Sequence, residues 1–133
     1  MRKFFITASV AIAVAAALFT GPTVTLAGED IIASGSFKGA SSHVTNGNVT
    51  IRKTADGVVV VLEEDFDFDG APDPKLGFGK DGKYDHGSQI SHLGSNKGRQ
   101  VYEVPASIDP EAYNEFYVWC EKYSVPLGVA NLK

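Results

Sequence analysis

Cys120 is the only cysteine in the 133-residue sequence, and its thiol is the side chain with the widest range of chemistry here. A thiol can act as a redox centre, ligate a metal or a haem, or pack as a small apolar group. Because a single cysteine cannot form a disulfide within its own chain, this thiol is buried, ligated, reactive or paired between chains.

Cys120 falls in a segment whose residues alternate in the manner of a strand. The alternation puts Phe116, Val118 and Cys120 on one face, and Trp119 on the other. This pattern predicts a buried thiol that packs as a small hydrophobe. A reactive thiol would instead need a cationic or hydrogen-bonding neighbour, for which Lys122 and His43 are the candidates.

The three histidines, His43, His86 and His92, could combine with Cys120 as a blue-copper set. Such a centre usually has a histidine and an axial methionine shortly after the cysteine. Neither follows Cys120, and Met1 is the only methionine. We therefore expect the histidines to be polar surface residues and do not expect copper.

Asp65, Asp67 and Asp69, followed by Gly70, match the opening of a calcium-binding helix-loop-helix loop. The match ends there, because the twelfth position of such a loop needs a glutamate and here is Leu76. The aspartates alternate with Phe66 and Phe68, which predicts an acidic strand edge whose phenylalanines face the core. Calcium is therefore not expected.

The segment from Gly77 to Gly82 fits a bare dinucleotide-binding pattern. That pattern requires a helix to follow, and the residues 83–88 do not favour one, so we interpret it as a glycine-rich loop. Motifs of serine hydrolases and zinc proteases are missing from the sequence. We do not expect an enzyme in its own right.

Residues 1–27 have the layout of a signal peptide: Arg2 and Lys3 precede an apolar run, and small residues follow it at the expected cleavage site. Its removal leaves one domain, 28–133, with ten basic and sixteen acidic residues, a net charge of −6. This charge argues against nucleic acid as a partner. We expect a periplasmic or secreted protein with no stable membrane insertion after cleavage.

Beyond residue 27, short apolar runs alternate with turn-forming clusters, which predicts an all-β fold. We expect one compact β-sandwich or barrel-like domain of short antiparallel strands, with at most one or two helical turns near 110–115. Asn46-Gly47 predicts a tight hairpin within Val44–Ile51, and Asp56-Gly57 predicts a turn before the apolar strand Val58–Leu62.

The order of several short motifs resembles the DM-thirteen domain, also called the electron-transfer DM domain, over Ala33 to Leu132. The matching pieces are Gly35-Ser-Phe-Lys with His43 and Gly47, the strand from Val59 to Phe66, Gly70-Ala-Pro-Asp-Pro74 with Gly77-Phe-Gly79, Leu93-Gly94, Gly98 to Pro105, and Trp119 to Gly128. Two departures are Asp73-Pro74, where an Asp-Leu type pairing is often seen, and Tyr123 in place of a phenylalanine.

The resemblance implies a compact extracytoplasmic β-domain whose cysteine takes part in redox chemistry, as a bare thiol or as a ligand of a prosthetic group. Cys120 matches that cysteine, Trp119 and His43 are its implied neighbours, and Asp73 lies in a structural or ligand-facing turn. Haem is compatible with this role, although no cofactor is identified by the residues themselves.

Two hypotheses follow. The first is an exported redox or electron-transfer accessory domain that acts through Cys120 on an extracytoplasmic partner. The alternative is a non-enzymatic binding or adhesion module, in which loops within Lys80–Gly98 recognise a partner and Cys120 only packs. The first requires a thiol that reacts in the native state, and the second requires one that does not.

Overall fold

The computed structural model describes residues 30–133, and the expected signal peptide lies outside them. Almost all of the regular structure is antiparallel strand, which confirms the all-β prediction. The elements are β1 (Asp30–Gly39), β2 (Thr45–Asn46), β3 (Asn48–Thr54), β4 (Gly57–Leu62), β5 (Asp67–Phe68), β6 (Pro74–Lys80), β7 (Lys83–Tyr84), η1 (His86–Ser88), β8 (Ser91–His92), β9 (Gln100–Glu103), η2 (Pro110–Ala112), β10 (Glu115–Cys120) and β11 (Val125–Asn131).

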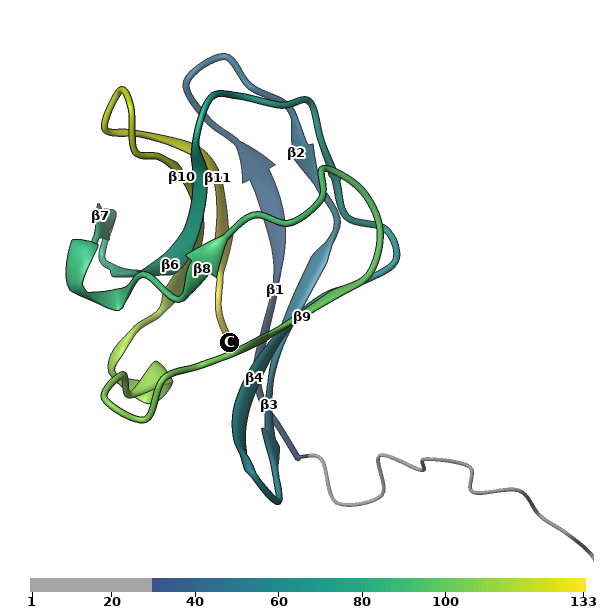
Figure 1. The fold of residues 1–133 in the computed structure, drawn as a ribbon, viewed down its shortest axis with the longest axis vertical. Helices are drawn as coiled ribbons and strands as arrows, with labels where there is room; N and C mark the ends of the chain where they lie inside the picture. The colour runs from purple at the N-terminus through teal and green to yellow at the C-terminus, as the bar shows by residue number, and fades with distance from the viewer. Residues whose placement is uncertain (1–29) are drawn as a thin grey trace, which may run out of the picture.

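One curled sheet forms the body of the domain, as Figure 1 shows. Its strands run in the order β7-β6-β10-β11-β1-β3-β4-β9, and β8 adds to β6. The long strand β1 pairs with β3 along Asp30–Ser36 and with β11 along Phe37–Gly39, so it changes partner along its length. Irregular pairing in β1 and β10 increases the local twist, and the sheet closes into a half-barrel.

The concave face of the sheet holds the apolar core of the described residues. It combines residues from both halves of the chain, including the phenylalanines of β1, β6 and β10. Phe66 and Phe68 are buried while Asp65, Asp67 and Asp69 are exposed, which confirms the expected alternation in this segment. The core reaches Cys120 at the end of β10.

The turn predicted before Val58–Leu62 is confirmed: Asp56 lies in it, and Gly57, at φ +145°, follows as the first residue of β4. The expected short helix is also present as η2, which follows the cap residue Asp109. At both places the turn or cap residues determine the backbone conformation, because it depends on about four consecutive residues and not on distant contacts.

The tight hairpin expected within Val44–Ile51 is wrong. Thr45–Asn46 pairs instead with Asp67–Phe68 as a separate two-stranded sheet. Gly47, at φ +106°, is the corner between β2 and β3, and a Cβ there would lie 2.5 Å from the Cα of Phe66. The glycine therefore permits a close backbone approach from a distant segment, which a local turn signal does not reveal.

Candidate functional site

Cys120 ends β10, which lies between β6 and β11 in the sheet. Phe116, Val118 and Cys120 share the core face of this strand and are all buried, with Cys120 exposed to 1%. The predicted alternation and burial of the thiol are thus confirmed. The strand positions the sulfur at the rim of the core, where the sheet ends and a turn covers it.

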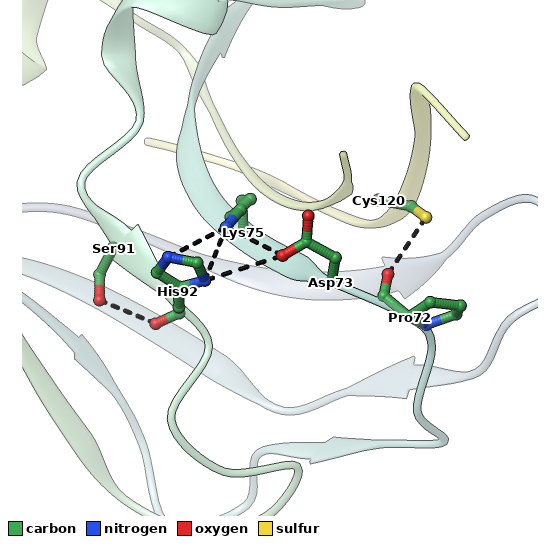
Figure 2. Close-up of polar contacts among 6 residues, drawn as sticks. All are labelled: Pro72, Asp73, Lys75, Ser91, His92 and Cys120. Atoms are coloured by element: carbon green, nitrogen blue, oxygen red, sulfur yellow. Dashed lines mark hydrogen bonds and ion pairs between the residues drawn. The ribbon is translucent and has the colours of Figure 1, made fainter. Parts of the chain in front are cut away.

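That covering turn is the segment Gly70–Asp73, which leads into β6. The Cys120 Sγ donates a hydrogen bond to the carbonyl oxygen of Pro72 over 3.4 Å (Figure 2). Only the protonated thiol has a hydrogen for this contact, and a thiol is a weak donor. The backbone of this turn therefore covers the sulfur on this side.

The turn has an unusual backbone. Gly70 has φ +96°, and Asp73 has φ +51° although it is not a glycine. Left-handed backbone is several times more common for aspartate than for most other residues, but it still requires support from the surroundings. The Asp73 carbonyl oxygen accepts from the amide of Glu121 over 3.3 Å, which ties the turn to the residue after Cys120.

Lys75 provides the second support. Its Nζ lies 2.9 Å from Asp73 Oδ1, and its side chain is exposed to 9%. The same Nζ lies 2.6 and 3.0 Å from the two ring nitrogens of His92, its register partner on β8. As Figure 2 shows, Asp73, Lys75 and His92 form one cluster beside Pro72 and Cys120, which we call the turn-holding cluster.

Sequence reasoning placed Asp73 in a turn near the site but missed Lys75 and His92 as its partners. Lys75 is one of many lysines in the chain, and no local motif marks it. The pairing of β8 with β6 brings His92 to it. Long-range register of this kind has no signal in a single sequence.

His43 makes its contacts away from the thiol. Its Nδ1 lies 2.9 Å from Asp69 Oδ1, and its ring packs 6.0 Å from that of Phe68. Asp69 also accepts from the amide of Val44 over 2.9 Å. That backbone hydrogen bond, and then the one from His43, lower the pKa of the Asp69 carboxyl. His43 thus holds the loop between β1 and β2 to the segment after β5.

Trp119 lies on the opposite face of the sheet from Cys120. Its ring stacks on Tyr84 with centroids 4.4 Å apart and planes 10° apart, and His86 meets it edge-on. Trp119 Nε1 and Tyr84 Oη are both buried without a hydrogen-bond partner in the described structure. The two neighbours in sequence therefore have separate surroundings, and the sheet lies between their side chains.

The glycine pattern at Gly77 and Gly79 belongs to this outer face. Both glycines lie within β6 rather than in the expected loop. A Cβ at Gly77 would lie 2.7 Å from Tyr84 Oη, and one at Gly79 would lie 2.3 Å from Tyr117 Cε2. The absence of side chains at these glycines leaves room for the two tyrosine rings. Burial raises the pKa of Tyr84 and of Tyr117 to about 12.

The weaker metal candidates do not converge. Asp65 accepts from the backbone and side chain of Asn48, Asp67 pairs with Lys97 at 3.7 Å, and Asp69 binds His43. Within residues 30–133, no group of three or more His, Cys, Asp or Glu side chains is arranged to hold a metal ion.

The surroundings of Cys120 do not fit a haem in this conformation. A macrocycle ligated through sulfur needs an open face on that sulfur and a cavity of several hundred Å³ beside it. The Cys120 side chain is instead enclosed among core residues, and its sulfur contacts the Pro72 carbonyl. We therefore derive no step through a prosthetic group.

Fold and site together define a small all-β domain with one buried thiol beneath a proline-containing turn. The chain belongs to the Electron transfer DM13 family, whose model matches residues 36–132. No curated protein matches the chain, and no solved structure does. The matched range includes Cys120 and the whole turn-holding cluster.

Proposed function

We propose that this chain is an exported redox domain whose Cys120 thiol exchanges electrons with an extracytoplasmic partner when the Gly70–Asp73 turn opens. The observation that carries the proposal is the position of the thiol. It is the single cysteine of a member of an electron-transfer family, at the rim of the core, covered by one turn. A rim position needs a local opening, whereas a central core position would need global unfolding.

Thiol–disulfide exchange is the chemistry that one thiol can perform with its own atoms and a partner's. After the turn opens, the Cys120 thiol loses its proton to water, and the thiolate attacks one sulfur of a partner disulfide. A Cys120–partner disulfide forms, the partner's S–S bond breaks, and its other sulfur leaves as a thiolate. Cys120 is oxidised and the leaving sulfur is reduced.

The expected signal peptide at residues 1–27 supports export to a compartment where disulfide partners exist. No helix among residues 30–133 is long and apolar enough to cross a membrane. The net charge of −6 over residues 28–133 supports a protein partner rather than nucleic acid. We propose an accessory role in electron transfer, without a turnover reaction of its own.

The experiment is equilibration of the native protein with glutathione and its disulfide, followed by mass spectrometry of the intact chain. The proposal predicts a glutathione adduct on Cys120 under conditions where circular dichroism shows a folded protein. Cys120→Ser is the control that removes the adduct. Absence of an adduct in the native protein, with adduct formation after unfolding, would exclude this function.

The alternative is a binding module in which Cys120 only packs, and one observation favours it. Cys120 is exposed to 1% and belongs to the apolar core together with Val118 and Phe116. If this alternative holds, Cys120→Ala and Val118→Ala each lower the free energy of unfolding by about 1–3 kcal/mol and have no other effect. Partner binding that survives Cys120→Ser would then identify the module.

A further inference from the structure

β9 is the last strand of the half-barrel, and one of its edges has no partner among residues 30–133. It pairs with β4 in the register Val60 to Tyr102 and Leu62 to Gln100. The ladder continues past the strand, since the amide of Val104 donates to Val58. Because amides alternate in direction along a strand, those of Val101 and Glu103 face the other edge.

This free edge is accessible. The Val101 side chain is exposed to 50%, and Arg99 and Glu103 are exposed as well. A hollow of about 910 Å³ runs beside β9 and is lined also by Ile90 and Ile108. An edge strand with unpaired amides and an apolar residue at its centre is a template for pairing with another strand.

The residues of this edge are self-complementary. Arg99 and Glu103 lie two positions before and two positions after Val101. We propose that two copies of the chain pair antiparallel through β9, with Val101 opposite Val101 of the second copy. Each Arg99 then lies opposite Glu103 of the second copy, so the contact has two-fold symmetry.

The hydrogen-bonding pattern agrees with this register. Val101 and Glu103 lie at alternate positions of β9, and Arg99 directly precedes the strand with the same spacing. In the proposed register, the outward amides and carbonyls of these three residues all meet partners, with about six hydrogen bonds in total. A shift of two residues would keep the hydrogen-bond pattern but place Val101 opposite Arg99 or Glu103, so both Arg99–Glu103 pairs would be lost. Directly opposed charges of opposite sign stabilise an antiparallel pair, and like charges destabilise it.

The self-complementary charges favour a second copy over an unrelated peptide as the occupant. An unrelated extended peptide would use the same amides without any need for charges placed symmetrically about Val101. The paired segment is short, so its buried area falls below that of a standard interface. We expect a reversible dimer whose population rises with protein concentration.

The test is sedimentation velocity of the purified chain over a range of concentrations, in the Cys120→Ser background so that no intermolecular disulfide contributes. Glu103→Arg places an arginine opposite Arg99 of the second copy at both ends of the paired segment. We expect dimerisation to become about tenfold weaker. The double variant Arg99→Glu with Glu103→Arg restores the opposite charges, so its dimerisation should return to within about threefold of the parent. Glu111→Arg makes the same charge change away from the edge and should have no effect.

A second variant tests the backbone contact. Val101→Pro removes only an outward amide, so the pairing of β9 with β4 should survive and circular dichroism should show a folded chain. Dimerisation should fall by at least about tenfold, because two symmetric hydrogen bonds are lost. A monomer at all concentrations, or a dimer that neither Val101→Pro nor Glu103→Arg weakens, would overturn the proposal and leave the proposed role of Cys120 untouched.

Discussion

The Cys120 thiol and the Pro72 carbonyl oxygen are 3.4 Å apart, and this contact joins the end of β10 to the turn before β6. The two residues are 48 positions apart in the sequence. In the proposed function, access to the sulfur therefore depends on the backbone of this turn. The stability of that turn, rather than the exposure of the resting thiol, should set the rate at which Cys120 reacts.

Lys75→Met should make Cys120 more reactive in the native state. The variant removes the 2.9 Å ion pair with Asp73, and we estimate its contribution at about 1 kcal/mol because Asp73 is partly exposed. Opening of the turn, and therefore modification by N-ethylmaleimide, should become about fivefold faster. Lys80→Met, an exposed lysine at the end of the same strand, is the matched control. Equal rates in the two variants would show that the turn-holding cluster does not control access.

Gly79→Ala should destabilise the fold more than Gly77→Ala. The new methyl group at position 79 would lie 2.4 Å from the Lys83 backbone carbonyl oxygen, which cannot move without disrupting the β6–β7 hairpin. At position 77 its nearest neighbour is the hydroxyl end of Tyr84, which can shift. We expect losses of about 3 and about 1 kcal/mol in urea unfolding. The reverse order would contradict the arrangement of rings on β6.

Tyr84→Phe should leave the free energy of unfolding unchanged at pH 7 or raise it. The Tyr84 hydroxyl is buried without a hydrogen-bond partner among residues 30–133, so its removal eliminates an unsatisfied polar group. Thermal unfolding at neutral pH checks this expectation. A loss above about 1 kcal/mol would show that the hydroxyl makes a stabilising hydrogen bond.

The same variant should alter the alkaline unfolding profile. Tyr84 and Tyr117 titrate at about 12 in the fold, against about 10 in an unfolded chain. Since the folded pKa values are higher, the stability that these neutral rings contribute is present below pH ~10 and is lost between pH ~10 and ~12. Tyr84→Phe should therefore lose less stability over this interval than the parent does, as followed by tyrosinate absorbance and unfolding.

Much of the fold could be predicted where the physics is local. The alternation of Phe66 and Phe68 with aspartates, the face of β10 that carries Cys120, and the Asp56-Gly57 turn all follow from a period of two or from turn chemistry. Gly47 shows the limit of such reasoning. This glycine is needed because the backbone of Phe66 passes close to it. In the sequence, such a glycine cannot be told from one that forms a tight turn.

The site could be predicted only in part for the same reason. Cys120 was identifiable as the single thiol, and Asp73 as part of a turn. The cluster of Lys75 with His92, and the stacking of Trp119 on Tyr84, depend on the register of β6 with β8 and on the fold of the 80–84 hairpin. Such contacts join segments whose pairing is decided by the whole core, so no local pattern contains them.

The most direct test of the central claim is the rate of Cys120 modification by N-ethylmaleimide in the native chain at increasing low urea concentrations. Opening of one turn exposes little surface, so we expect a modification rate almost independent of urea until global unfolding begins. Modification that rises with the full urea dependence of global unfolding, from the lowest concentration onward, would contradict it. The thiol would then be reached only in the unfolded chain, and Cys120 would be a core residue without a redox role.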